Sequence, residues 1–412
     1  MVSGKPLFGK GQKYFPGRGG LMVKIPIYHM NHLGSMEGKV AVSHFNFGSS
    51  PRLPRRITVY DTTLRDGEQM AGISFTPAQK VSIARMLDDI GVPQIEAGFP
   101  AVSGGEKRAV RAVARAGLDA KILCLSRLRK EDIDAAQDAE ADAALLFIAT
   151  SPLHLEHKLR MTEQQILDSI VKALDHAHKL GLKASFTPED ATRTPLPFLR
   201  KVIRTAVAAG AWRVGLADTL GCITPEALGK LVSELRPLTR TSFSLHLHND
   251  YGLALANALS GLQAGADAVA TTVAGFGERS GNVPLEQFTG ALRFLLGRDI
   301  GIRTEGLTPI ARAVARMARI PLPPNAPLVG EGVFTHKAGI HIAGVLREPA
   351  TYESVPPELL GNTRRIALGK YSGRAAIRAL LGAGGNAPDE REVELLLRKL
   401  KRKSKDIATS FK

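Results

Sequence analysis

The sequence predicts an α/β protein in which eight parallel strands close into a (β/α)8 TIM barrel, followed by a small, mostly helical C-terminal region. Two observations support this prediction. Short apolar runs recur from Ile57 onward at spacings of about 25–35 residues, which is typical of βα units. Polar residues gather directly after several of these runs, as expected of a barrel whose active site lies at the C-terminal ends of its strands.

The individual elements follow the same rhythm. Eight apolar runs are candidate strands: 57–62, 94–99, 120–126, 143–150, 182–188, 212–218, 242–248 and 268–275. Helical patterns lie between them, such as 77–90, 163–180, 195–209, 225–235 and 252–264. A left-handed C-cap favours glycine just past a helix, and this position is taken by Gly91, Gly181, Gly210 and Gly265.

The competing architecture is a doubly wound open sheet. Such a sheet normally carries a glycine-rich turn after its first strand. Here the first run is followed by Thr62-Thr63-Leu64-Arg65-Asp66-Gly67, so we favour the barrel.

The 412 residues suit one barrel domain of about 250 residues with a smaller appendage. We expect a barrel domain at 57–300 and a C-terminal region at 301–385, with helical patterns at 306–319, 338–346 and 373–381. A further helical pattern at 389–403 lies in a basic tail at 386–412, and residues 1–56 form a basic extension that we expect to be disordered.

The net charge of +16 comes mainly from the two ends of the chain. Residues 1–56 carry nine basic groups and one acid, and residues 398–412 carry seven basic groups and one acid. The remainder is only +2, whereas nucleic-acid binding would call for a basic stripe on the folded domain. We therefore expect no nucleic-acid partner, and the alternative of a basic-tailed scaffold or nucleic-acid protein that kept a dead barrel is disfavoured.

Cysteine usage and hydropathy bear on the compartment. The chain has two cysteines, Cys124 and Cys222, with no C-x-x-C motif, which fits a reducing cytosol. No apolar run approaches the ~20 residues needed to cross a bilayer. We expect a cytoplasmic protein with no membrane partner.

The most informative stretch is His246-Leu247-His248-Asn249-Asp250, at the end of the seventh apolar run. Side chains alternate along a strand, so both histidines point to the same face. Two imidazoles on one face can share a metal ion, and the alternative is a pair of buried, hydrogen-bonded histidines. Asp66 is the natural third ligand, although a turn or cap aspartate is the competing reading.

One carboxylate and two imidazoles leave open positions for substrate, as in catalytic sites, and tolerate Mg²⁺, Mn²⁺ or Zn²⁺. Such a metal can chelate a 2-keto acid and act on its keto group as a Lewis acid. Arg65 is placed to stabilise the alkoxide that forms, unless it makes a structural ion pair. Thr219 is a candidate for binding the substrate carboxylate, or it closes its own turn.

Six motifs resemble the homocitrate synthase and 2-isopropylmalate synthase family over about 57–381. They are DTTLRDGEQ (61–69), EDATRT (189–194), LADTLG (216–221), HLHNDYGLALAN (246–257), GFGERSGN (275–282) and FTHKAGIH (334–341). Members of this family join acetyl-CoA to a 2-keto acid in a Claisen-type condensation and then hydrolyse the thioester. The resemblance therefore implies an acyltransferase with acetyl-CoA as co-substrate and a divalent metal as cofactor.

The resemblance also implies residue roles. Asp66, His246 and His248 would hold the metal, with Asn282 as a further ligand or neighbour. Arg65 would polarise the keto oxygen, Thr219 would bind the keto-acid carboxylate, and Glu189 would serve in the acid/base network. His341 and Tyr352 would assist proton transfer and thioester hydrolysis from a C-terminal region that leans over the barrel of a partner subunit, which implies a homodimer.

The keto acid is predicted to be 2-oxoglutarate, with 2-oxoisovalerate or pyruvate as the alternatives. The segment from Thr351 to Gly373 is similar to the short homocitrate synthases, especially those that serve nitrogenase cofactor assembly. The sequence stops about 40 residues after Gly369-Lys370-Tyr371-Ser372-Gly373, which leaves no room for the regulatory domain of leucine-inhibited 2-isopropylmalate synthases.

Two positions depart from the family pattern. Ser185 stands where lysine-pathway homocitrate synthases have an arginine for the distal carboxylate and where isopropylmalate synthases commonly have a glutamate. Tyr371 replaces the usual histidine of the Lys-x-Ser-Gly motif. Arg127 or His154 is expected to supply the binding group for the distal carboxylate instead.

Overall fold

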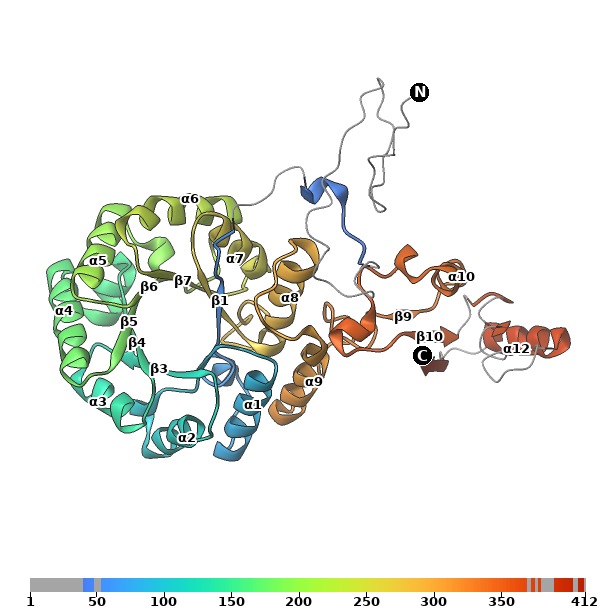
Figure 1. Ribbon diagram of the computed structural model, residues 1–412, viewed down its shortest axis with the longest axis horizontal. Coiled ribbons are helices and arrows are strands. Elements are labelled where there is room, and N and C mark those ends of the chain that lie inside the picture. The colour runs from blue at the N-terminus through green and yellow to red at the C-terminus, as the bar shows by residue number, and fades with distance from the viewer. Residues whose placement is uncertain are drawn as a thin grey trace, which may run out of the picture.

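The computed structural model describes residues 40–47, 53–368, 372–374, 377–378, 389–402 and 407–410. Its central feature is a closed barrel of eight parallel strands, seen nearly end-on in Figure 1. The strands are β1 (Thr58–Asp61), β2 (Gln94–Glu96), β3 (Lys121–Arg127), β4 (Ala143–Ala149), β5 (Lys183–Glu189), β6 (Arg213–Asp218), β7 (Ser242–Leu247) and β8 (Ala268–Thr271). β1 pairs with both β2 and β8, so the predicted barrel is confirmed and the open sheet is excluded.

A helix follows each barrel strand, and these helices form the outer ring in Figure 1. They are α1 (Pro77–Asp89), α2 (Gly104–Ala114), α3 (Lys130–Asp138), α4 (Glu163–Lys179), α5 (Leu196–Ala208), α6 (Pro225–Leu235), α7 (Ala254–Gln263) and α8 (Leu285–Gly290). Local sequence explains their ends: α1 and α4 begin with capping boxes, in which Thr76 pairs with Gln79 and Thr162 with Gln165. The four glycines predicted at helix ends all have positive φ.

Two apolar layers follow from the alternation of side chains along the strands. The larger core lies between the sheet and the helices and includes Phe186, Phe243 and Phe288. A smaller cluster of Tyr60, Leu123, Ala143, Leu145 and Ala270 is separate from it. In β7, Phe243, Leu245 and Leu247 belong to the larger core, which leaves His246 to face the barrel interior.

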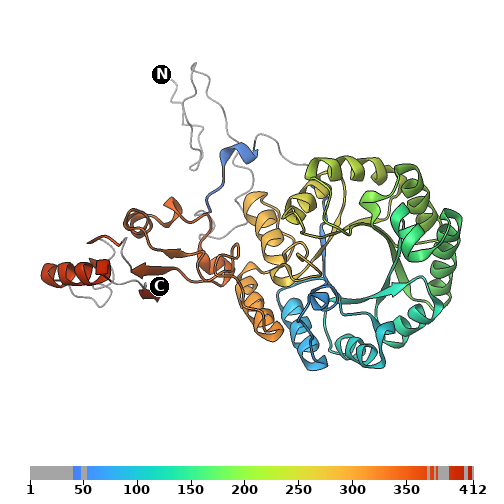
Figure 2. The same ribbon diagram turned by 180° about the vertical axis from the view of Figure 1, so that it is seen from behind.

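The C-terminal region begins with α9 (Leu307–Ala318), which lies beside α1 and α8, and continues beyond it away from the barrel. This part extends to one side in both views (Figures 1 and 2). It contains α10 (Gly339–Arg347), α12 (Glu390–Arg402) and a three-stranded sheet of β9 (Thr335–His336), β10 (Arg365–Leu368) and β11 (Ile407–Ser410). The helices match the predicted segments at 338–346 and 389–403, whereas the sheet was not predicted.

Two expectations fall largely outside the described residues: the disordered extension over most of 1–56 and the helix at 373–381, along with Tyr371. Residues 40–47 are described and include a short 3-10 helix, His44–Phe47. Among the helices of the described chain, none is long and apolar enough to span a bilayer.

Candidate active site

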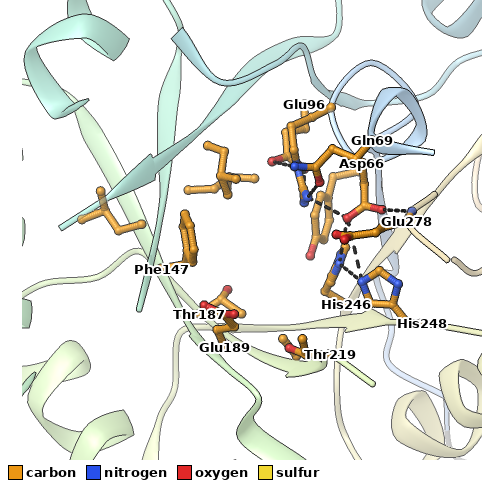
Figure 3. Close-up of a pocket in the computed structure, with 16 residues that line it drawn as sticks. Asp66, Gln69, Glu96, Phe147, Thr187, Glu189, Thr219, His246, His248 and Glu278 are labelled. Carbon is orange, nitrogen blue, oxygen red and sulfur yellow. Dashed lines mark hydrogen bonds and ion pairs between the residues drawn. The ribbon is translucent and has the colours of Figure 1, made fainter. Parts of the chain in front are cut away.

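A cavity of about 230 Å³ opens among the C-terminal ends of the barrel strands (Figure 3). Residues from the ends of β1 to β7 and from the loop after β8 line it. They are Tyr60, Arg65, Asp66, Gln69, Glu96, Leu125, Leu145, Leu146, Phe147, Thr187, Glu189, Ala217, Thr219, His246, His248 and Glu278. The cavity therefore lies where a barrel of this kind carries its active site.

Asp66, His246 and His248 come together on one side of this cavity. One potential ligand atom from each lies within 4.8 Å of the other two. His246 Nε2 is 3.3 Å from His248 Nε2, and Asp66 Oδ2 is 3.4 Å from His246 Nε2 and 3.9 Å from His248 Nε2. The alternation along the strand thus places both imidazoles on one face. Closure of the barrel places Asp66, which follows the first strand, beside them.

The charge state of this group suits a cation. Burial acts to raise the pKa of Asp66, but the charge of Arg65 and the hydrogen bond from His246 hold that pKa well below its ordinary value. Burial, followed by the neighbouring His246, lowers the pKa of His248 to about 4. A carboxylate and a neutral imidazole are the forms that coordinate metals.

Asn282 lies directly beside the group. Its Nδ2 donates to Asp66 Oδ1 (2.8 Å), and its backbone forms an isolated bridge with His248. Asn282 is fully buried, and its Oδ1 has no hydrogen-bond partner among the described residues; the same holds for His248 Nδ1. Buried polar atoms rarely lack a partner in folded proteins, and an oxygen, two imidazoles and a carboxylate form a donor set that fits Mg²⁺, Mn²⁺ or Zn²⁺.

Arg65 is held from two sides at the edge of the group. Its Nε and Nη2 donate to Glu96 Oε1 and Oε2 (2.7 and 3.1 Å), and its Nη1 donates to Asp66 Oδ2 (2.6 Å). Burial acts to lower the pKa of Arg65, but Glu96 and Asp66 raise it above its ordinary value. The guanidinium is thus a fixed positive charge within the cavity.

Glu189 lines the cavity across from Asp66 (Figure 3) and has a cationic partner that was not predicted. Lys158 Nζ donates to both of its carboxylate oxygens, at 2.6 and 2.9 Å. His154 Nδ1 lies 3.6 Å from Glu189 Oε1. The predicted acid/base residue therefore lies in the cavity and is held by the π-helix His154–Leu159 that follows β4.

Thr219, just after β6, also lines the cavity. Its Oγ1 accepts a hydrogen bond from the Asp190 backbone N–H (2.9 Å). A threonine hydroxyl both donates and accepts, so its own hydrogen is available for a ligand in the cavity.

His341 and Tyr352 are not brought to this cavity. Their rings stack on each other at 4.1 Å, on α10 and directly after the 3-10 helix Pro349–Thr351. They belong to the C-terminal region that extends away from the barrel in Figures 1 and 2. Within one chain they stand apart from Asp66 and the histidines.

The wall opposite the histidines is apolar and includes Leu125, Leu145 and Phe147. Neither Ser185 nor Arg127 is among the cavity-lining residues. Ser185 is buried on β5 two residues before Thr187, and Thr187 does line the cavity. Arg127 donates twice to Asp132 and lies over the Phe99 ring, so the prediction that it points to a substrate receives no support from its position.

Glu96, Gln69 and Lys158 were missed by the sequence reasoning. Glu96 had a usable signal, because a charged residue inside the apolar run 94–99 is expensive to bury unless it is paired. Lys158 lies in the charged π-helix His154–Leu159, where the sequence does not distinguish a solvated lysine from one that reaches Glu189.

Comparisons with known proteins bear on this site. The family model described as HMGL-like matches residues 56–314, and the one described as Homocitrate synthase post-HMGL domain-like matches residues 328–407. The Homocitrate synthase AksA of Methanopyrus kandleri is 48% identical over 349 residues, covering 85% of this chain and 88% of that protein. The Probable 2-isopropylmalate synthase of Ignicoccus hospitalis is 47% identical over 351 residues, with 85% and 88% covered.

Among solved structures, the hydroxymethylglutaryl-CoA lyase from Pseudomonas aeruginosa superposes with a TM-score of 0.61 at 21% identity, covering 66% of this chain and 97% of that one. This likeness concerns the barrel fold alone. The fold and the cavity define a TIM-barrel protein with a polar site at the strand ends. By its family-model match and its relatives, the chain belongs to the HMGL-like family, in the group that includes homocitrate synthases and 2-isopropylmalate synthases.

Proposed function

We propose that this chain condenses acetyl-CoA with a 2-keto acid and then hydrolyses the thioester, and that its keto acid is 2-oxoglutarate, which makes it a homocitrate synthase. A carbon–carbon bond forms between the acetyl methyl carbon and the keto carbon, and water then releases free CoA. The observation that carries the proposal is the meeting of Asp66, His246, His248 and Arg65 in one cavity. The identity of 48% to a protein named homocitrate synthase supports the choice of keto acid.

Asp66, His246 and His248 would hold a divalent cation, with Asn282 Oδ1 as a further ligand or close neighbour. When bound, this cation would supply Lewis-acid polarisation of the keto group. The chain's own residues do the rest of the positioning. Arg65 directs its fixed positive charge at the oxygen that gains negative charge, and Thr219 donates its hydroxyl hydrogen to the keto-acid carboxylate.

Glu189, held by Lys158, faces the same cavity and would accept and return protons during the condensation. His341 and Tyr352 would act in hydrolysis from the C-terminal region of a partner subunit, because their own chain keeps them away from the cavity. We propose on this basis a cytoplasmic homodimer in which the barrel, residues 57–300, carries the chemistry. Residues 301–385 would complete the site of the neighbour, and the ends, 1–56 and 386–412, would lie outside the catalytic machinery.

A second candidate is an enzyme that takes an apolar keto acid, such as 2-oxoisovalerate for 2-isopropylmalate or pyruvate for citramalate. The apolar wall of Leu125, Leu145 and Phe147 favours it. Among the described residues that line the cavity, Arg65 is the sole lysine or arginine, and it is already paired with Glu96. Chain length does not separate the candidates, because the alignment covers 88% of both the homocitrate synthase and the probable 2-isopropylmalate synthase.

The test is the release of free CoA from acetyl-CoA, followed with a thiol reagent in the presence of Mg²⁺ or Mn²⁺. The four keto acids to compare are 2-oxoglutarate, 2-oxoisovalerate, pyruvate and oxaloacetate. The highest kcat/KM with 2-oxoglutarate supports homocitrate synthase, and the highest with 2-oxoisovalerate or pyruvate replaces it with the second candidate. Release with none of the four contradicts the condensation itself.

A further inference from the structure

Arg279, in the loop after β8, joins three loops at the mouth of the barrel. Its Nε and Nη2 donate to Asp250 Oδ1 and Oδ2 at 2.8 and 2.9 Å, and its Nη2 also donates to the Thr219 carbonyl at 2.6 Å. Asp250 follows β7 and Thr219 follows β6. One guanidinium therefore connects the ends of three neighbouring strands.

Each end of this connection lies close to a residue of the candidate site. Asp250 is two residues after His248, and Arg279 follows Glu278, whose backbone N–H donates to Asp66 Oδ1 (3.1 Å). Thr219 itself lines the cavity, although Arg279 does not. Arg279 thus contacts the frame of the site without being part of the cavity wall.

The β6 loop is pressed tightly against the β7 loop at the same place. Gly221 has a φ of +59°, and a Cβ there would lie 2.8 Å from both Asp250 Oδ2 and the His248 carbonyl oxygen. A side chain at 221 would push the two loops apart. The close approach of these loops and the hydrogen bonds of Arg279 therefore both hold the β6 loop against the β7 loop.

Thr219 is consequently held from two sides. Arg279 fixes its carbonyl, and the Asp190 N–H fixes its hydroxyl oxygen. This pair of contacts fixes where the Thr219 hydroxyl oxygen lies, from which its hydrogen is donated. Binding groups need to be held within about 0.5 Å of the productive geometry to be effective.

The guanidinium of Arg279, which connects these loops, stays positively charged. The hydrogen bond that Arg279 donates to Asp250 is the main cause that raises the pKa of Arg279 above its ordinary value. Arginine offers a planar fork that grips a carboxylate and retains another donor for the carbonyl, which a lysine ammonium reproduces less well.

We propose that Arg279, clamped by Asp250, is a positioning residue that aims the Thr219 hydroxyl at the carboxylate of the keto acid. This inference rests on the proposed condensation activity. It assigns to Arg279 an effect on the affinity for the keto acid rather than on the affinity for the metal or for acetyl-CoA.

The experiment compares Arg279→Gln, Arg279→Lys and the double variant Asp250→Asn/Arg279→Gln with the wild type. For each, KM for the keto acid, KM for acetyl-CoA, kcat and the Kd for Mn²⁺ are measured, along with the thermal midpoint of unfolding. In Arg279→Gln we expect KM for the keto acid to rise about tenfold, as for the loss of a charged hydrogen bond. KM for acetyl-CoA and the Kd for Mn²⁺ should change by less than about twofold.

Arg279→Lys should recover part of the keto-acid affinity, and Asp250→Asn combined with Arg279→Gln should be no worse than Arg279→Gln alone. Arg115→Gln is the matched control, because Arg115 grips Glu140 with the same fork on the outer helices. An unchanged KM for the keto acid overturns the proposal. Equal losses in keto-acid and Mn²⁺ binding also overturn it, since they indicate general support of the loops. A wild type that is inactive with every keto acid contradicts the proposed function instead.

Discussion

Glu96 fixes the direction of Arg65. Both carboxylate oxygens of Glu96 accept hydrogen bonds from Arg65, at 2.7 and 3.1 Å, and the remaining face of the guanidinium reaches Asp66. Glu96 is fully buried at the end of β2. Burying a charged carboxylate is costly without such a partner, so the pair holds Arg65 in a single orientation.

Glu96→Gln should therefore lower kcat while leaving the metal site in place. The amide keeps one acceptor but turns a donor towards the arginine fork, so Arg65 loses its fixed direction. We expect kcat to fall about tenfold or more, on the scale known for donors that stabilise a developing oxyanion. The measurement is CoA release, with the Kd for Mn²⁺ as the second readout. The control is Glu140→Gln, which removes, on the C-terminal side of α3, the carboxylate partner of an exposed arginine. An unchanged kcat in folded Glu96→Gln would show that Asp66 and Gln69 suffice to hold Arg65.

Removal of the metal should abolish CoA release reversibly. Treatment with a chelator followed by dialysis should stop the reaction, and added Mn²⁺ should restore it in the wild type. Asp66→Asn and His246→Ala should weaken the Kd for Mn²⁺ by about a hundredfold, because each alters a proposed ligand. His176→Asn is the control, since His176 pairs with Asp134 between outer helices. Wild-type Mn²⁺ affinity in Asp66→Asn would refute the ligand set.

Two buried carboxyls should make the protein less stable as the pH rises. Burial raises the pKa of both Asp61 and Glu286 to about 7, whereas their unfolded values are about 4. The folded state therefore keeps protons that the unfolded state releases between about pH 4 and pH 7. The stability these groups contribute is fully present below the lower value and is lost as the pH rises through the higher one.

Asp61→Asn isolates this effect. Its urea midpoint should fall less than that of the wild type between pH 5 and pH 7.5, because one of the two groups no longer titrates. The comparison is made between variants since His248, whose pKa is lowered to about 4, acts with the opposite sign in part of this range. Parallel curves for the two proteins would show that Asp61 ionises at an ordinary pH in the folded state.

The sequence predicted those parts of the molecule that depend on local periodicity. The strand runs follow from the spacing of apolar segments, the helix-ending glycines from the left-handed cap, and the shared face of His246 and His248 from the two-residue repeat of a strand. The barrel then brings Asp66 to the histidines through closure of β1 on β8. Pairings between side chains distant in the sequence were not predictable in this way: Glu96 with Arg65, Lys158 with Glu189 and Arg279 with Thr219 each depend on a side chain reaching across to another segment.

The C-terminal sheet escaped prediction for a similar reason. β9 has two residues, too few to show an alternation, and β10 pairs with β11 across the intervening α12 segment. The helical periodicity of 338–346 and 389–403 could be recognised in the sequence. The short strands beside these helices were recognised only through their pairing in the structure.

The separation of His341 and Tyr352 from the cavity leads to the last prediction, which concerns subunit exchange. If these residues complete the site of a partner subunit, Asp66→Ala and His341→Ala damage different halves of each site. A mixed dimer of the two variants then contains one intact site and one doubly damaged site. Random mixing should restore about a quarter of wild-type CoA release, since half of the dimers are mixed and each has one good site.

The control mixture is Asp66→Ala with His246→Ala, because both residues belong to the same barrel and no pairing of these chains creates an intact site. The mixtures are made by joint unfolding and refolding, and each variant alone should be nearly inactive. Restored activity in the first mixture but not in the control would establish that the C-terminal region works across the dimer. Inactivity of both mixtures, with wild type recovering after the same treatment, would place His341 at the site of its own chain. An active His341→Ala protein on its own would place His341 outside the chemistry.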